Sequence, residues 1–294
     1  MRCRNVLFLS ALMATASCVW AQSSSVLKLE FDVASVKENK TGDQPQANFP
    51  LGPGAMYNPN GGVFAATSMP MWIYIMFAYK MTDHQVEVMR KQLPAWAAEG
   101  QFDIQARTDK QDVTKDEMRA MMQALLHDRF KLVVHTATEQ TAVYGLVVAK
   151  AGRPGLRVHP AGDASCTNSP VAVADKAAKG GTVEGGFPAV CGGAAYVPAS
   201  MAGRIAMGYR NVPVSLIALQ MTALGGLDRP VVDETGMTGN VDFVIEFSPE
   251  RAGTEVSGPS FREALADQTG LKLVGGKKAV EVILVDHIEY PTAN

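Results

Sequence analysis

The side chains best suited to chemistry in this sequence are its five histidines, and their spacing matches no known catalytic or metal site. They stand at positions 84, 127, 135, 159 and 287. None is four residues from another, so no single helix presents two imidazoles to one metal ion. The sequence also has no H-E-x-x-H, G-x-S-x-G, C-x-x-C or P-loop pattern. We therefore assign no catalytic residue, no metal ligand and no cofactor from the sequence.

A few polar residues remain as candidates for a pocket. Asp286 and His287 are predicted at the end of a strand, where successive side chains point to opposite faces and so cannot both face one site. Asp233 opens the segment D-E-T-G-M-T-G-N, whose glycines favour a tight turn. A Ca²⁺ site of carboxylate oxygens is the alternative there, although the spacing follows no known loop. Arg204, Asp233 and His287 are our candidate pocket residues.

The N-terminal segment has the features of an export signal. Two early arginines are followed by a run of apolar or small residues from Val6 to Trp20. Val19 and Ala21 occupy the −3 and −1 positions of a small-residue cleavage site. The run is about 15 residues long, whereas a membrane span needs about 20. Residues 1–21 are therefore predicted to be a signal peptide rather than a membrane anchor.

Removal of this leader leaves two of the four cysteines, Cys166 and Cys191. In an oxidising compartment they predict one disulfide, closing a loop of about 25 residues and worth about 3–4 kcal/mol in the chain-entropy model. Lipidation of Cys18 is disfavoured because no Leu stands three positions before it. We expect a periplasmic or secreted protein with no membrane span after leader cleavage, because no other stretch reaches spanning length.

The charge of the chain argues against two classes of partner. Without the two arginines of the leader, the chain has 25 Lys and Arg against 29 Asp and Glu, a net charge of −4. It has no basic stripe and no polybasic tail. Nucleic acid and anionic lipid surfaces both attract proteins with concentrated positive charge. Neither is therefore the expected partner, and the oligomeric state stays open.

A first block of secondary structure is predicted between residues 61 and 150, after a strand and loop over 22–60. Ser68, followed by Pro70 in the first turn, predicts the start of a helix over 69–81. A T-x-x-E capping box at Thr114 predicts a second helix, because methionines and leucines follow it at i, i+3, i+4 and i+7. The predicted strands are 63–67, 86–89, 102–107 and a closing hairpin of 131–135 and 143–150 around a polar turn at 136–140.

A second block, over 203–294, repeats this order. Asn211 and Pro213 correspond to Ser68 and Pro70, and a capping box at Ser260 corresponds to the one at Thr114. The predicted strands are 204–209, 230–232, 241–247 and a closing hairpin of 271–274 and 279–286. Each block has the order β-α-β-β-α-β-β, so the predicted fold class is α+β with two duplicated modules. The Gly- and Ala-rich residues 151–202 are predicted to be an insertion with little regular structure, stapled by the disulfide.

Five segments match a pattern known from other sequences. They are F-D-V-A-S-V-K at 31–37, F-D-I-Q-A at 102–106, D-R-F-K-L at 128–132, D-R-P-V-V-D at 228–233 and V-D-H-I-E at 285–289. With them the chain resembles the soil-associated DUF3738 family over nearly its whole length after the leader. The resemblance implies no established activity. Some members look fused to membrane metallopeptidase sensors of the beta-lactam-responsive type, which implies a sensory or interaction role, and this chain lacks that membrane part.

The second block shows a weaker likeness. F-R-E-A-L at 261–265, followed by Q-T-G-L at 268–271, is similar to the short βαβ domains at the N-termini of secretins and TonB-dependent transducers. Those domains are protein-interaction modules, so this resemblance also implies an interaction role.

From these features we expect an extracytoplasmic binding, interaction or sensory protein. Its sheet edges, or a cleft between its modules, would contact an envelope protein or a small ligand, and strand addition at a sheet edge is the expected mode. The alternative is a hydrolase that acts on an envelope or extracellular substrate, with its site between the two modules.

Overall fold

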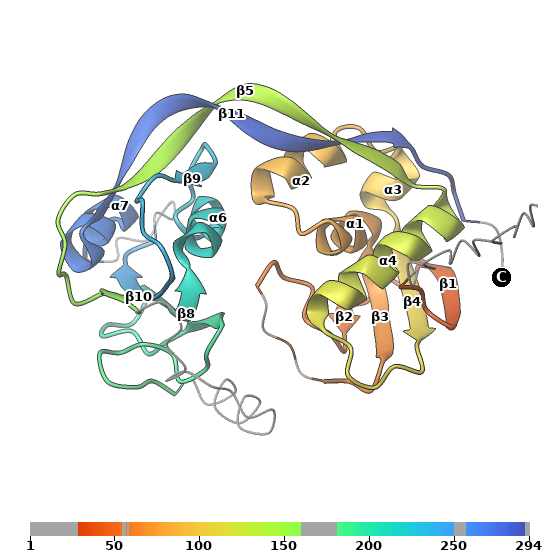
Figure 1. Ribbon diagram of the computed structural model, residues 1–294, viewed down its shortest axis with the longest axis horizontal. Coiled ribbons are helices and arrows are strands. Elements are labelled where there is room, and N and C mark those ends of the chain that lie inside the picture. The colour runs from red at the N-terminus through yellow and green to blue at the C-terminus, as the bar shows by residue number, and fades with distance from the viewer. Residues whose placement is uncertain (1–28, 55–56, 58, 160–180, 250–256, 292–294) are drawn as a thin grey trace, which may run out of the picture.

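The chain folds into two lobes joined by a long two-stranded arch (Figure 1). The computed structural model describes residues 29–54, 57, 59–159, 181–249 and 257–291. Within these residues, three sheets and six α-helices make the fold α+β, as predicted. The predicted signal peptide, Cys18 and Cys166 lie outside the described residues, so the leader and the disulfide stay predictions.

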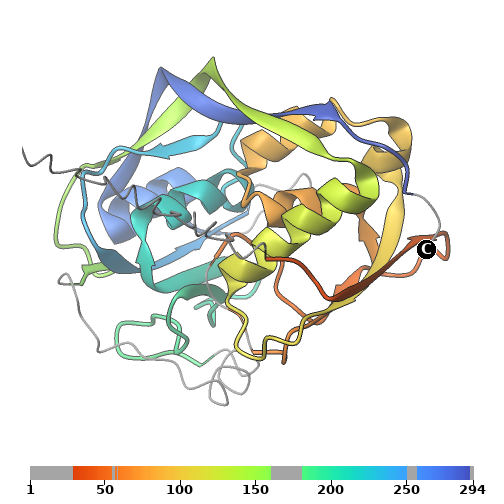
Figure 2. The ribbon, with the colours of Figure 1, turned by 45° about the vertical axis from the view of Figure 1, so that its right-hand side comes forward.

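The first lobe packs its helices against one face of an antiparallel sheet with the strand order β1-β4-β3-β2. Burial alternates along its central strand, so only one face carries the core. In Figure 2, the long yellow-green helix α4 lies to one side of these strands. The core includes Phe64, Phe102, Met118 and Phe130. Its elements are β1 (Val33–Asn39), β2 (Gln46–Ala47), β3 (Val63–Pro70), α1 (Met71–Ala78), α2 (Asp83–Arg90), α3 (Ala95–Glu99), β4 (Gln101–Arg107) and α4 (Lys115–Phe130).

The second lobe has a core of its own. Its sheet has the order β6-β10-β8-β7, and Tyr209, Ile217, Phe243 and Leu265 are among the residues buried between this sheet and the helices. Its elements are β6 (Leu156–Val158), β7 (Gly193–Tyr196), β8 (Ile205–Pro213), α6 (Val214–Leu224), β10 (Asn240–Phe247), α7 (Phe261–Ala264) and the π-helical turn η1 (Leu265–Thr269).

The arch consists of β5 (Val133–Val148) and β11 (Leu271–His287), which pair antiparallel along their lengths. Each strand starts in one lobe and ends in the other, as the green and blue ribbons of Figure 1 show. The short strand β9 (Val231–Asp233) adds to β5 in parallel. The two predicted closing hairpins are therefore wrong: each is one continuous strand, and the two strands pair with each other.

The polar stretch at 136–140 explains part of this error. Its residues, T-A-T-E-Q, include no Gly, Pro, Asn or Asp, so they offer none of the backbone conformations that a tight hairpin needs. The Gly275-Gly276 pair in β11 does carry a turn signal, yet it lies opposite Tyr144 and Val143 in an unbroken ladder. Pairing with a strand from the other half of the chain outweighs the local preference.

Two local predictions in the first lobe also need correction. The predicted strand at 86–89 lies inside helix α2, because the side chains of Thr82 and Gln85 form a reciprocal capping box that starts a helix. The helix predicted over 69–81 is shorter, Met71–Ala78, and its N-cap residue is Pro70 rather than Ser68. The capping boxes predicted at Thr114 and Ser260 are confirmed.

Ser68 and Asn211, which were predicted as helix caps, lie instead in β-bulges. In each lobe two residues of one strand lie opposite a single aspartate of the next strand, Asp103 in β4 and Asp242 in β10. Ser68 and Asn211 both have a positive φ, 52° and 51°. Each donates its backbone N–H to the facing carboxylate, at 2.8 Å from Ser68 and 2.9 Å from Asn211. The bulge turns the chain from the strand into the helix that follows.

The segment 151–202 has more regular structure in its described part than predicted. Strands β6 and β7 extend the sheet of the second lobe on both edges. Phe187, Val190 and Cys191 are buried, and a side chain at Gly208 would collide with Pro188 at 2.6 Å. These described residues pack apolar side chains against the second-lobe sheet, which favours their regular structure.

Candidate functional site

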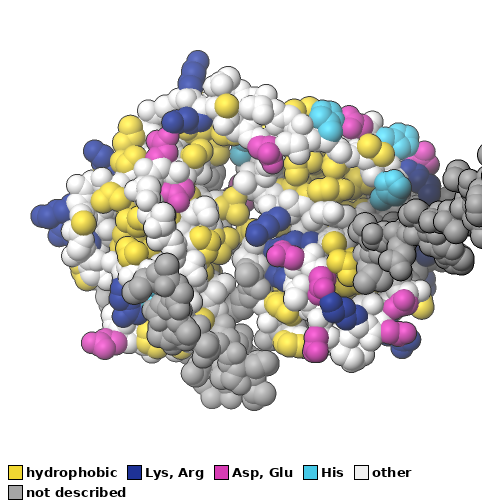
Figure 3. All heavy atoms as spheres, in the orientation of Figure 1, with side chains coloured by type: hydrophobic (Ala, Val, Ile, Leu, Met, Phe, Trp, Pro, Cys, Tyr) yellow, Lys and Arg dark blue, Asp and Glu magenta, His cyan; other side chains and the backbone are white. Residues whose placement is uncertain are grey.

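Two adjoining cavities, each of about 330 Å³, lie between the lobes beneath the arch. Both are lined by Asp83 and His84 from the first lobe and by Thr222 and Pro230 from the second. We call the two cavities together the interlobe cleft. In Figure 3 the surface is hollowed between the two lobes. The volume of each cavity lies at the lower end of the range for ligand pockets, which occur preferentially between domains.

The start of α2 is fixed beneath the arch by two side-chain contacts. Gln85 donates from Nε2 to the backbone oxygen of Glu281 in β11 at 3.0 Å. His84 Nε2 lies 2.8 Å from Oε1 of Glu139 in β5. Since α2 also buries Val86 and Met89, Asp83, which lies between the capping residue and His84, is held in the lining of both cavities.

Asp83 is an acidic side chain without a described cationic partner. It stays accessible to solvent, while the surrounding protein raises the pKa of its carboxyl by burial, against the lowering effect of the Ala223 backbone. Across the cleft its charge acts on Tyr209, although burial is the main reason why the pKa of that phenol is raised. Asp83 is therefore available to pair with a positively charged or hydroxyl group that enters from outside.

One of the two cavities, which we call the main cavity, combines an apolar wall with carboxylates. Its aliphatic lining includes Ala218 and Leu219 of α6 and Val231 and Val232 of β9. Its acidic lining residues are Asp83, Asp233 and Glu281, and no Lys or Arg is among the described residues that line it. None of the three carboxylates forms an ion pair with a described residue. An occupant that presents both apolar groups and positive charge fits this lining.

Of the three predicted pocket residues, only Asp233 lies in the cleft. Its Oδ1 accepts hydrogen bonds from the backbone N–H of Thr235 at 2.9 Å and from the Thr235 hydroxyl at 2.7 Å. Gly236 and Gly239 of the same segment have positive φ values, and the chain bends at Thr235 and Gly239 without forming a regular hydrogen-bonded turn. Among the described residues, no group of three His, Cys, Asp or Glu side chains could hold a metal ion.

Arg204 and His287 lie elsewhere. Arg204 pairs with Glu246 at 3.0 Å in the second lobe, and Ser200 donates to the same carboxylate. The side chain of His287 contacts Glu289 at 2.8 Å. In the register of the sheet, His287 lies opposite residue 133 at one end of β5, whereas Asp233 lies opposite residue 146. Thirteen residues of strand separate the two, roughly 40 Å along β5. The three candidates therefore do not form one pocket.

Asp286 and His287 contact different partners, as expected for successive residues of a strand, whose side chains point to opposite faces. Asp286 contacts His135 of the neighbouring strand at 2.8 Å, whereas His287 contacts Glu289 instead. No hydroxyl of a described residue hydrogen-bonds to any of the histidines.

Sequence reasoning missed the cleft residues of α2 and α6. The T-x-x-Q pattern of Thr82–Gln85 was the available signal for the start of α2. No local signal places this helix start against Ser215, Leu219 and Thr222 of α6, because the contact depends on how the lobes meet.

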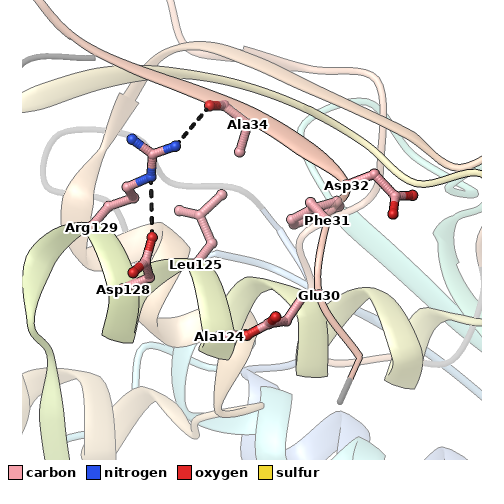
Figure 4. Close-up of a pocket in the computed structure, with 8 residues that line it drawn as sticks. All are labelled: Glu30, Phe31, Asp32, Ala34, Ala124, Leu125, Asp128 and Arg129. Carbon is pink, nitrogen blue, oxygen red and sulfur yellow. Dashed lines mark hydrogen bonds and ion pairs between the residues drawn. The ribbon is translucent and has the colours of Figure 1, made fainter. Parts of the chain in front are cut away.

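A further cavity of about 340 Å³ lies on the first lobe alone, between the segment before β1 and the end of α4 (Figure 4). In Figure 4 the guanidinium of Arg129 points toward the backbone oxygen of Ala34, to which it donates at 3.2 Å, and it pairs with Asp128 at 3.3 Å. The Arg129 guanidinium therefore contacts groups of the first lobe itself. We favour the interlobe cleft as the candidate site because both lobes build it.

No helix among the described residues has the length and apolar character that a membrane crossing requires. Comparison with curated proteins and with solved structures gives no match. A family model described as a protein of unknown function, DUF3738, matches residues 73–288. This match includes every residue that lines the interlobe cleft and spans well over half of the 294 residues. The chain therefore belongs to the DUF3738 family, whose function is unknown.

Proposed function

We propose that this chain is an extracytoplasmic binding and interaction protein that holds its partner in the interlobe cleft. One observation carries this proposal: the same cavities are lined by side chains from both lobes and from the arch. An occupant of the cleft contacts two separately packed cores at once. Its binding energy therefore depends on how the lobes sit relative to each other, which is what a binding or sensory domain requires.

The arch is the element through which such binding would be transmitted. Each lobe has its own hydrophobic core, and β5 and β11 run between them as a two-stranded ribbon. A ribbon of two strands has no third strand to stiffen its middle, so we propose that small changes in its twist move one lobe against the other. An occupant wedged between α2 and α6 would favour one arrangement.

Duplication of one module accounts for the two lobes. The same bulge, the same positive φ and the same carboxylate contact occur at Ser68 with Asp103 and at Asn211 with Asp242. The last strand of each module, β5 or β11, follows that module's second helical segment and then crosses to the other lobe. We propose an ancestral pair of identical modules that exchanged these strands, as in domain swapping.

Export and the disulfide belong to the same proposal. The leader pattern of residues 1–21 supports export. Cys191 is buried against the second lobe, where a bond to Cys166 would fasten the segment that covers this sheet. The likeness to secretin and transducer domains supports an interaction role only as a resemblance. The hydrolase alternative loses its main support, because its candidate residues lie apart.

Blocking the cleft tests the proposal. Ser215 lines the main cavity and is exposed, so Ser215→Trp should fill the cavity without disturbing either core. Immobilised chain and the Ser215→Trp variant would each be incubated with envelope extract from the source cells, and the retained proteins compared by mass spectrometry. The matched control is Lys91→Trp, at an exposed position just after α2 that lines neither cavity. We expect a partner retained by the wild type and by Lys91→Trp but lost from Ser215→Trp. Equal retention by all three would show that the cleft is not the site.

A further inference from the structure

Residues 279–281 of β11 line the main cavity, and the edge of this strand that β5 does not cover is contacted by Gln85 of α2. Gln85 donates to the backbone oxygen of Glu281, and Val285 donates its N–H to Oε1 of Gln92 at 3.0 Å. These contacts show that Glu281 and Val285 turn their backbone groups away from β5. In an antiparallel ladder alternate residues do so, so Ala279 turns its N–H and C=O the same way.

A contact on the other edge of the ribbon independently shows which residues of β11 point their backbone groups away from β5. Tyr144 of β5 donates its N–H to Pro230, which is outside the ribbon. Tyr144 lies opposite Gly275, so odd-numbered residues of β11 point away from β5, and Ala279 is one of them. Ala279 lines the main cavity, and no described residue outside the ribbon bonds to its backbone groups. Within the part of the chain that the structure describes, Ala279 therefore has an N–H and a C=O without a partner, next to the Glu281 carbonyl that Gln85 occupies.

The charges and the apolar wall of the main cavity define what can lie along this edge. Asp83, Asp233 and Glu281 bring negative charge with no described cation to balance it. Leu219 and Val231 provide aliphatic surface within the same lining. In a strand, successive side chains point to opposite faces, so a chain that alternates apolar and basic residues can meet both surfaces at once.

We infer that the occupant of the cleft is an extended peptide segment of a partner protein, with Lys or Arg alternating with apolar residues, which adds as a strand to the edge of β11 at Ala279. This inference rests on the proposed binding function and specifies its ligand. The backbone of the segment pairs with Ala279. Its basic side chains lie near the three carboxylates, and its apolar side chains contact α6 and β9.

The probe is a fluorescein-labelled octapeptide of alternating Lys and Val, titrated with the purified full chain and followed by fluorescence anisotropy at low salt. The matched peptides are one of alternating Glu and Val and one of Lys and Val with N-methylated backbone amides. We expect the Lys-Val peptide to bind, and the Glu-Val peptide to bind at least about tenfold more weakly, because several exposed ion pairs become repulsive. The N-methylated peptide cannot donate to the edge, so we expect it to bind at least about tenfold more weakly as well.

Two pairs of variants test the mode of binding. Ala279→Pro removes only an N–H that points away from β5, so the ladder should survive, whereas Ala279→Val keeps the N–H. The double variant Asp83→Asn with Asp233→Asn removes two charges from the cleft, and Asp109→Asn removes one at a residue that lines neither cavity. We expect Ala279→Pro to bind about tenfold more weakly than Ala279→Val, which carries a side chain of similar size but keeps the N–H. We expect the double variant to bind about tenfold more weakly than the wild type, and Asp109→Asn to bind as the wild type does. Circular dichroism and melting temperature check that each variant is folded.

The outcomes separate this inference from the proposed function. Equal binding of the Lys-Val and Glu-Val peptides, or unchanged binding by folded Ala279→Pro, would overturn the inference. If neither peptide binds while Ser215→Trp still abolishes retention of the native partner, the cleft is a binding site for a different class of ligand and only the inference fails. If Ser215→Trp also has no effect, both fail.

Discussion

Asp242 offers the sharpest test of how the second lobe is built, through its replacement by alanine. Its side chain is fully buried in the bulge between β8 and β10. It accepts hydrogen bonds from Nε of Arg157 at 2.9 Å, from His159 Nε2 at 2.7 Å and from the backbone of Asn211 at 2.9 Å. Burial alone would raise the pKa of this carboxyl, but these contacts outweigh burial and lower it.

The expected loss follows from what each partner can do after the change. Removing one side of a buried ion pair costs about 3–5 kcal/mol, and the lower end applies because Arg157 is 48% exposed and can be rehydrated. The matched change in the first lobe is Asp103→Ala. Asp103 is only half-buried and accepts from Asn39 Nδ2 and the Ser68 N–H, both at 2.8 Å, so about 1–2 kcal/mol is expected. Asp242→Ala should therefore lower the free energy of unfolding by at least about 1 kcal/mol more than Asp103→Ala does.

Urea unfolding followed by circular dichroism measures both losses. The pH dependence gives a second check on the charge of Asp242. Because its folded pKa is lowered below 3.8, its stabilisation is present above the unfolded pKa and is lost as pH falls through the folded pKa. The difference in stability between the wild type and Asp242→Ala should thus shrink below about pH 4. Equal losses for the two alanine variants, or a difference that is independent of pH, would refute this reasoning.

Three further predictions concern other parts of the chain. Gln85→Ala removes the hydrogen bond to the arch and the capping bond from the Thr82 N–H. It should therefore cost about 2 kcal/mol and speed amide hydrogen exchange at the start of α2; unchanged exchange there would contradict it. Burial lowers the pKa of Lys115 to about 7 from 10.5, so the unfolded chain binds more protons between these values and stability should rise from pH 7 to pH 10. Urea midpoints should show this rise in the wild type but not in Lys115→Met. Gly270→Ala places a Cβ 1.7 Å from a backbone oxygen, whereas at Gly236, which also has a positive φ, nothing lies within 4 Å. Gly270→Ala should therefore lower the melting temperature far more than Gly236→Ala, which should cost only about 1–2 kcal/mol.

The parts of the fold that the sequence predicts correctly depend on local patterns. The capping boxes that begin at Thr114 and Ser260 place two helices correctly, because the signal lies within four residues of the helix start. The alternation in 102–107 and 241–247 likewise predicts β4 and β10. In these segments local preference and tertiary packing agree.

The errors arise where partners are distant in the chain. The middle of β5 is polar because a two-stranded ribbon leaves much of its surface in water, and this polarity resembles that of a turn. Its partner β11 begins more than a hundred residues later, so no short window of sequence reveals the pairing. Ser68 and Asn211 were misassigned for a related reason: a residue before X-Pro suits a helix cap, but a carboxylate on the neighbouring strand holds it in a bulge instead.

The candidate site was out of reach for the same reason. Its lining comes from α2, α6, β9 and the arch, between residues 82 and 281. Asp233 was identified because acidic residues and glycines cluster around it. Asp83 and Ser215 gave no signal, since only the meeting of the two lobes places them in one cavity.

Hydrogen exchange, measured by mass spectrometry on the chain alone and with its captured partner bound, tests the central claim most directly. If the interlobe cleft is the binding site, the partner should slow amide hydrogen exchange most in three segments: 82–85, 230–233 and 279–281. Little change is expected in the first-lobe cavity near Arg129. Protection confined to that cavity, or to the exposed face of the first-lobe sheet, would contradict the account.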